Sequence, residues 1–479
     1  MTDQTLNRAS GASSSDSPLT HILDWNDLSD SAISGKTFSV VTFGCQMNKH
    51  DSERIVGMLT ALGATEVETV EESDIIIFVT CCVREAADVR LMGQVASLKN
   101  VPLRENSPVD KRIVVIGGCI GQRDGEELVK ELPHVDVVFG TFNLASLPRL
   151  IEETLLTGKH EVEVLSEASD FPTDLPSERE SKWSAWLPIS IGCNNFCSYC
   201  IVPYVRGREK SRPIEDIVAD AEALKADGVK EITLLGQNVN SYGRDLYKEP
   251  RFADLLRAVS ATGIERIRFA TSHPKDLNDD VIRAFGELDN LMPALHLPVQ
   301  SGSNAILKAM NRRYTRERYL ETIEKLRKVR PDIALSTDII VGFPGETEED
   351  FQQTYDLIKE VGYTQVFTFI YSKREGTPAA RMEDDTPREV IQERFERLVD
   401  LVQDGALAAN QSEAGKVVPV LVEGVSKRDS NVLMGRSPKN QTVHAPIPEG
   451  VTIEELQGSI INVHIDVARA WYLKGQVVS

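Results

Sequence analysis

Three cysteines within eight positions are the residues of this sequence best suited to chemistry. Cys193, Cys197 and Cys200 lie in the stretch GCNNFCSYC, and no cysteine or histidine follows within the next 70 residues. Thiolates are soft ligands for zinc or iron–sulfur clusters. A structural zinc site is the alternative, but zinc takes four protein ligands. Three thiolates instead suit a four-iron cluster with one iron left open for another ligand.

Three further cysteines, called the first set because they come earlier in the chain, follow predicted strands nearer the N-terminus. Cys45 comes after FSVVTFG, Cys81 after DIIIFVT and Cys119 after RIVVIGG. Ligands of open α/β sheets bind outside the carboxyl ends of the strands, so we expect these thiols to converge. A free cysteine is commonly buried as a small hydrophobic residue. Three at equivalent strand ends favour a second cluster, again with an open iron.

The elements that must position these residues indicate an α/β multidomain chain. Residues 36–158 alternate strand and helix patterns, as in an N-terminal open parallel α/β sheet. Residues 183–410 hold six strand–helix units, which fit a partial (β/α)6 barrel better than a closed eightfold one. Residues 411–479 contain four short strand segments, the last being SIINVHIDVARAWYLKG, as in a small β-barrel. Residues 1–35 are predicted to be a disordered tail and 159–182 an acidic linker.

Composition restricts the function classes. The chain has 479 residues and a net charge of −20, which argues against indiscriminate nucleic-acid binding, so any RNA contact must be local. It has neither an apolar run of membrane-spanning length nor a signal-peptide pattern. We therefore expect a cytoplasmic protein with no membrane contact. Seven cysteines in a reducing compartment favour metal ligation over disulfides.

The motifs resemble those of the methylthiotransferases of the radical S-adenosylmethionine superfamily over about residues 36–479. The stretches that carry this resemblance are TFGCQMN, TCCVREAA, GGC, GCNNFCSYCIVPYVRGRE, LLGQNVNSYG, LHLPVQSGSN and STDIIVGFPGET. The C-terminal barrel resembles a TRAM domain, the RNA-binding module of this family. The stretch CQMN is similar to that of the branch acting on tRNA.

The resemblance implies two [4Fe-4S] clusters and S-adenosylmethionine as cofactors. The expected reaction inserts a methylthio group at C2 of N6-dimethylallyladenosine-37 in a tRNA anticodon loop, a carbon that acid–base chemistry cannot readily functionalise. Expected partners are the tRNA, a low-potential electron donor such as flavodoxin or ferredoxin, and a sulfur donor. Two alternatives stay open: the same chemistry on threonylcarbamoyladenosine-37 or on a ribosomal-protein aspartate, and a non-enzymatic iron–sulfur or zinc RNA-binding module.

The sequence departs from the family at Cys82, because relatives commonly have a single cysteine after Thr80. Counting back from Val83 places Cys81 in the ligand register. If the strand geometry persists, Cys82 points to the other face and fills space. The predicted cluster ligands are therefore Cys45, Cys81, Cys119, Cys193, Cys197 and Cys200.

Polar residues at the ends of the barrel strands are candidates for binding S-adenosylmethionine, although helix caps and turn contacts explain many such residues. The candidates are Tyr199, Gln237, Asn238, Thr271, Gln300, Ser301, Asp338 and Gly342. His273 fits a turn equally well. For RNA, the basic stretch 308–330, the group Arg206, Arg208, Lys210 and Arg212, and the aromatic pair Trp471 and Tyr472 are candidates. The alternatives are a solvated helix face for 308–330 and a core position for the aromatic pair.

Overall fold

A six-stranded parallel sheet carries the first set of cysteines. The computed structural model describes residues 31–82, 85–166 and 175–478, and its first sheet has the order β2-β1-β3-β4-β5-β6. Its strands are β1 (Thr37–Thr42), β2 (Thr65–Glu66), β3 (Ile75–Thr80), β4 (Ile113–Gly118), β5 (Val137–Phe139) and β6 (Glu161–Glu163). Its helices are α1 (Gln46–Ala61), α2 (Glu85–Ser97), α3 (Cys119–Asp124), α4 (Glu126–Glu131) and α5 (Leu147–Thr157).

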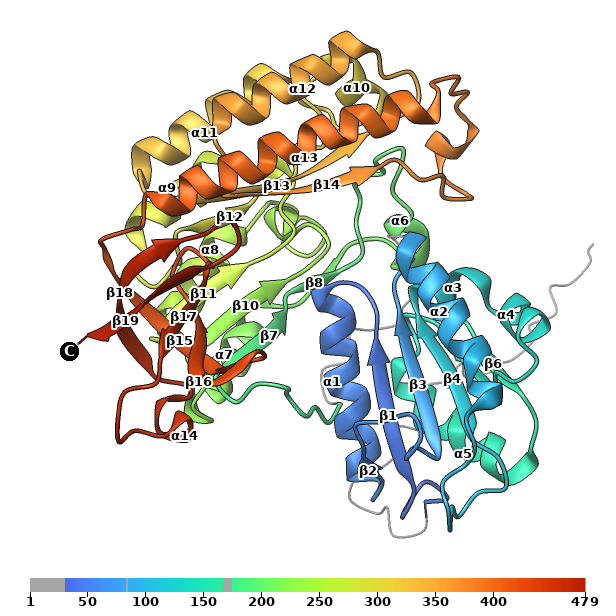
Figure 1. Ribbon diagram of the computed structural model, residues 1–479. Coiled ribbons are helices and arrows are strands. Elements are labelled where there is room, and N and C mark those ends of the chain that lie inside the picture. The colour runs from blue at the N-terminus through green and yellow to red at the C-terminus, as the bar shows by residue number, and fades with distance from the viewer. Residues whose placement is uncertain (1–30, 83–84, 167–174, 479) are drawn as a thin grey trace, which may run out of the picture.

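The central strand β3 explains why this sheet needs helices on both faces. All six of its residues, IIIFVT, are buried. Ile75 and Ile77 join the core under α1 and α5, whereas Ile76 and Phe78 join the core under α2, α3 and α4. Such a continuous apolar run is typical of parallel strands covered on both sides. The layers are visible in Figure 1, where this domain is drawn in blue to teal.

Six parallel strands in two sheets form the partial barrel, which confirms the predicted architecture. The sheet orders are β11-β10-β7 and β12-β13-β14, and one parallel bridge, Ile267 to Leu291, joins β11 to the segment before β12. The strands are β7 (Ser184–Pro188), β10 (Glu231–Leu235), β11 (Arg266–Phe269), β12 (Ala294–His296), β13 (Ala334–Val341) and β14 (Gln365–Ile370). The outer helices are α7 (Ile214–Ala226), α8 (Phe252–Ala261), α9 (Asp279–Glu287), α11 (Arg316–Val329), α12 (Glu348–Val361) and α13 (Arg388–Gln411).

Shorter elements follow some of the barrel strands along the chain. They are β8 (Ser190–Ile191), which pairs antiparallel with β9 (Lys210–Ser211), and the helices α6 (Val202–Val205) and α10 (Asn304–Ala309). The two strands bracket the loop with Cys193, Cys197 and Cys200, so the ribbon fixes both ends of that loop. No helix in the described parts of the chain is both long enough and apolar enough to cross a bilayer.

The C-terminal segment is a closed five-stranded barrel with the order β15-β16-β17-β19-β18. Its elements are β15 (Val417–Ser426), β16 (Asp429–Arg436), β17 (Thr442–Pro446), α14 (Ile453–Leu456), β18 (Ile460–Ala468) and β19 (Leu473–Val478). The prediction of a single strand at 459–475 is wrong. The segment forms two strands, because a turn closed by the Arg469 N–H on the Tyr472 carbonyl (2.9 Å) reverses the chain.

The C-terminal barrel is held against the wall of the partial barrel. On β11, Arg266 donates to the carbonyls of Arg436 and Pro419 (2.9 and 2.8 Å), and Arg268 donates to those of Pro438 and Ser437 (2.9 and 2.8 Å). The long helix α13 packs on β14 and reaches β18 (Figure 1). At its end, the Asn410 amide donates to the carbonyls of Arg469 and Ala470.

Two expected boundaries need correction. The strand β6 lies within the range predicted as acidic linker, because Glu161–Glu163 pairs with β5 as an edge strand whose acids reach solvent. Ile33, within the predicted tail, is fully buried in the core under α1 and α5. Residues 1–30 of that tail and residues 167–174 of the linker lie outside the described residues.

Candidate functional site: two thiol sets and the barrel mouth

Adjacent strands bring the first set of cysteines to one edge of the sheet, as predicted. Cys81 and Cys119 directly follow β3 and β4, which are paired in register through Thr80 and Gly118. Cys45 lies three residues beyond β1 and caps α1. Gly44 has φ +117°, and a Cβ there would lie 2.2 Å from the Cys81 Cβ. A glycine is therefore required for Cys45 to pass over Cys81.

Two thiol–thiol hydrogen bonds involve this set, one between Cys45 and Cys81 and the other between Cys119 and the neighbouring Cys82. The contact with Cys81 lowers the pKa of the exposed Cys45 to about 5. The contact with Cys82 lowers the pKa of the buried Cys119 to about 7, and the same contact raises the pKa of Cys82. Because β3 ends at Thr80, strand alternation does not extend to Cys82. Cys82 fills the apolar core, as predicted, but it also touches Cys119.

Arg206 reaches this thiol set from the partial barrel. Its Nη2 donates to the Asn48 Oδ1 (2.8 Å) and to the Asp51 Oδ2 (3.0 Å) on α1. It also hydrogen-bonds to the Cys119 thiol. Burial opposes its charge, yet attraction by Cys119, Asp51 and Cys45 holds the pKa of Arg206 well above its ordinary value. A buried guanidinium thus joins the two domains at the thiols.

The second thiol set lies at the mouth of the partial barrel. Gly192 (φ +76°) follows β8, and the Cys193 N–H then donates to the Gly207 carbonyl (3.1 Å). The Arg312 Nη1 lies 3.4 Å from the Cys197 Sγ, and the His273 Nε2 lies 3.9 Å from it. Burial raises the pKa of Cys193 to about 11 and raises that of Cys200 further. A bound cation would offset this cost of ionising the thiols.

Buried polar atoms without partners gather beside these cysteines. Within the described residues they include Glu209 Oε1, Gln237 Oε1, Asn238 Oδ1, Asn240 Nδ2 and Ser272 Oγ. They lie at the carboxyl ends of β10 and β11 or in the segment that leads into β9. A buried polar atom without a partner costs about 1–3 kcal/mol, so each such atom calls for a bound polar group. The amino and carboxylate groups of an amino-acid ligand fit this chemistry.

Two strand-end candidates adopt a strained backbone. Thr271 after β11 has φ +66°, and Gln300 after β12 has φ +73°. A β-branched residue in this region is an outlier, and such residues cluster at ligand sites. The Tyr199 hydroxyl lies 3.5 Å from the Arg312 Nη1, beside the cysteine loop. These three positions agree with a role at the barrel mouth.

Fold contacts occupy three other candidates. The Ser301 hydroxyl is buried against the Thr354 hydroxyl (3.2 Å). The Gly342 N–H donates to the Glu346 carboxylate (2.8 Å), as in a turn. Asp338 lies within β13, and its carboxylate is 3.5 Å from the His296 Nε2. The turn alternative therefore describes Ser301 and Gly342 well.

Sequence reasoning missed two residues of the barrel mouth. Glu209 combines an unpartnered oxygen with a pKa that burial raises to about 7, and its place in the RGRE stretch was the available signal. Arg312 was expected on an RNA-facing or solvated helix face. That expectation is wrong for this residue, which is 4% exposed and lies against Cys197.

The rest of the basic stretch 308–330 is mostly paired on the outer helix surface. Ion pairs join Arg316 to Glu360, Arg318 to Glu321, Lys325 to Asp279, Lys328 to Glu324 and Arg330 to Asp332. This arrangement favours the solvated helix face. In the C-terminal barrel, Trp471 is 54% exposed, whereas Tyr472 packs on His444. Trp471 thus remains free to stack on another ring.

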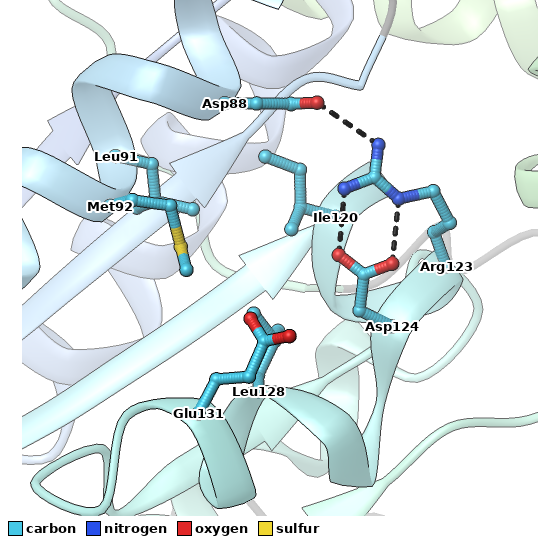
Figure 2. A pocket seen from close by; sticks show the side chains of 8 residues that line it. All are labelled: Asp88, Leu91, Met92, Ile120, Arg123, Asp124, Leu128 and Glu131. Carbon is cyan, nitrogen blue, oxygen red and sulfur yellow. Dashed lines mark hydrogen bonds and ion pairs between the residues drawn. The ribbon is translucent and has the colours of Figure 1, made fainter. Parts of the chain in front are cut away.

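In the described ranges, no three His, Cys, Asp or Glu side chains are arranged so that they could hold a single metal ion. A four-iron cluster does not need such a centre, because each cysteine binds a different iron. A separate cavity of about 110 Å³ lies between α2, α3 and α4 (Figure 2). There, Arg123 pairs with Asp124 and Asp88, and none of the predicted site residues lines the space. This cavity is distinct from both thiol sets.

Three family models match the three parts of the chain. They are described as the radical SAM superfamily (residues 187–358), uncharacterized protein family UPF0004 (37–140) and TRAM domain (411–478). A tRNA-2-methylthio-N(6)-dimethylallyladenosine synthase of Thermoanaerobacter sp. is 48% identical over 92% of each chain. Proteins of the same name from Acidothermus cellulolyticus (50%; 85% of this chain, 82% of the relative) and Streptomyces coelicolor (47%; 93% and 88%) are also similar. The chain belongs to this synthase family.

The solved structures agree with the fold of a radical SAM protein. The radical S-adenosylmethionine methyltransferase TsrM of Kitasatospora setae has a TM-score of 0.51 at 12% identity, with 72% of this chain and 77% of TsrM covered. Its structure contains cobalamin and a [4Fe-4S] cluster. At this identity the likeness shows the fold alone. Membership of the superfamily implies S-adenosylmethionine and one [4Fe-4S] cluster for the synthase family.

Proposed function

We propose that this chain inserts a methylthio group at C2 of N6-dimethylallyladenosine-37 in tRNA, using S-adenosylmethionine. The observation that carries the proposal is that one segment connects the two three-cysteine sets. Arg206 lies six residues beyond Cys200 of one set and contacts Cys119 of the other. Relatives of this name and a TRAM domain support the substrate. The radical SAM match, 187–358, lies within our proposed barrel domain, 183–410.

The proposed ligands of one cluster are the second set, Cys193, Cys197 and Cys200, and those of the other cluster are the first set, Cys45, Cys81 and Cys119. When bound, the clusters and S-adenosylmethionine supply the one-electron chemistry that functionalises a carbon without an acidic proton. Glu209 and Asn238 would hold the amino group of S-adenosylmethionine by accepting hydrogen bonds through their unpartnered oxygens. Gln237 and Thr271 border the same space, at the ends of β10 and β11.

Residues of this chain also control the surroundings of the reacting groups. Arg312 donates to the Cys197 sulfur and, through Nη2, to the Pro298 carbonyl (2.6 Å), so it fixes the cysteine loop against the barrel. Burial keeps His273 neutral beside that sulfur by lowering its pKa. We further propose a low-potential flavodoxin or ferredoxin as reductant, a separate sulfur donor and a cytoplasmic location, where tRNA is found.

Nucleoside mass spectrometry of tRNA from a deletion strain tests the proposal. The methylthio derivative of N6-dimethylallyladenosine should disappear. It should return with the wild-type chain but not with Cys193→Ala or Cys45→Ala. Loss of a methylthio-threonylcarbamoyl nucleoside or of a modified ribosomal aspartate would assign the same chemistry to another substrate. Purified, reconstituted protein that never cleaves S-adenosylmethionine would overturn enzymatic function altogether.

A further inference from the structure

The segment that follows Cys200 leaves the partial barrel and enters the core of the N-terminal domain. Ile201 and Val205 are 5% and 2% exposed and pack in the same apolar cluster as Cys119 and Cys82. The Thr141 hydroxyl donates to the Val205 carbonyl (2.5 Å). Figure 1 shows α6 next to α3 at the junction of the domains. The position of this segment is therefore set by the domain that carries the first cysteine set.

Arg206 ends this segment with a buried charge. It is 7% exposed, and one carboxylate, that of Asp51, forms its ion pair at 3.0 Å. Its other contacts are the Asn48 amide oxygen and the Cys119 sulfur, with Cys45 close enough to act on its charge. A buried arginine is stable only where negative groups surround it. Within the described residues Asp51 is its carboxylate partner, and the Cys119 and Cys45 side chains of the first thiol set lie beside the guanidinium.

We propose that Arg206 is a positioning residue that couples the two thiol sets. Held by Asn48 and Asp51, its guanidinium sets the reduction potential of the cluster bound at Cys45, Cys81 and Cys119, and keeps the segment after Cys200 docked on that cluster. The inference rests on the proposed function, which places a cluster at the first thiol set. A thiolate-bound cluster gains one negative charge on reduction, so an adjacent positive charge stabilises the reduced form more than the oxidised form.

Redox titration followed by electron paramagnetic resonance tests this inference. The full chain would carry Cys193→Ala, Cys197→Ala and Cys200→Ala, so that only the N-terminal cluster remains. In this background, Arg206→Gln should lower the ratio of reduced to oxidised cluster about tenfold. For one electron, this equals a fall of about 59 mV in the reduction potential. Asp51→Asn removes the negative charge that pairs with Arg206, so it should raise the ratio of reduced to oxidised cluster. Arg206→Lys should restore most of the wild-type ratio.

The matched control is Arg208→Gln, which removes the same charge two residues further on, where the side chain is exposed and lies over the Phe196 ring at 4.4 Å. It should leave the ratio unchanged. Equal shifts in the Arg206→Gln and Arg208→Gln variants would overturn the inference, as would shifts of the same sign in the Arg206→Gln and Asp51→Asn variants. If the Arg206→Gln chain binds no iron, the results for the Asp51→Asn and Arg206→Lys variants decide the test. Unaltered chain that holds a single cluster would instead overturn the proposed function.

Discussion

Replacing Gly44 by alanine tests whether the sheet brings Cys45 and Cys81 together. Gly44 has φ +117°, and its added Cβ would lie 2.2 Å from the Cys81 Cβ and 3.0 Å from its Sγ. The strained backbone costs about 1–3 kcal/mol. The forced displacement of Cys81 costs about 1–3 kcal/mol more. Gly44→Ala should therefore lower the free energy of unfolding by about 2–6 kcal/mol and separate the two thiols.

Iron content measures the separation of the thiols. After anaerobic reconstitution, the unaltered chain should hold about eight irons and the Gly44→Ala chain about four, because each cluster contains four. Denaturant unfolding of the cluster-free full chain measures the stability change. These two measurements respond to the contact between Gly44 and Cys81, not to the barrel mouth.

Gly158→Ala is the matched control for Gly44→Ala. Gly158 also has a positive φ, +68°, but its added Cβ meets no atom within 4 Å. It ends α5 at an exposed position, so the substitution should cost about 1 kcal/mol and leave the iron content unchanged. A Gly44→Ala chain with full iron content and the stability of the Gly158→Ala chain would refute the predicted convergence of the thiols.

Three further predictions follow from the described contacts. Cys81→Ala should lose one cluster by iron analysis, whereas Cys82→Ala should keep both; full loading of the Cys81→Ala chain would reverse the ligand assignment. Burial raises the pKa of Glu53 from 4.5 to about 7, so the wild-type folded state loses stability as pH rises through 7. In denaturant unfolding, the free energy of unfolding of Glu53→Gln should match that of the wild type near pH 4.5 and exceed it by up to about 3 kcal/mol at pH 8. A difference in stability that does not depend on pH would contradict this. Arg268→Ala removes two hydrogen bonds to the C-terminal barrel. It should weaken the docking of this barrel on the partial barrel by about 2–4 kcal/mol and speed proteolysis after α13. An unchanged rate of cleavage would count against this docking.

Strand patterns and cysteine positions predict most of the fold and both thiol sets. The runs IIIFVT and RIVVIGG are apolar enough to require a sheet covered on both faces, and the cysteines directly follow them. What the sequence does not show is distance between elements. Arg206 and Arg312 read as surface charges in basic stretches, but each is buried against a thiol from another element. Only the packing of elements assigns them to the thiol sets.

Short elements and composition account for the remaining differences. The strand β6 has three residues, two of them glutamates, so acidic composition concealed it. Cys82 was assigned by strand alternation, which stops at Thr80. Glu209 lacked any periodic signal, and its role at the barrel mouth depends on the unpartnered oxygen that burial leaves. For Cys82, the local pattern thus ended two residues before the contact that matters.

The two arginines of β11 and the end of α13 fix the C-terminal barrel at three points. A module held in this way does not sweep through solvent on a tether. The spacing between its exposed Trp471 and the barrel mouth is then a fixed span. A ligand that touches both ends must match that span, so for such a ligand length would matter as well as chemical identity.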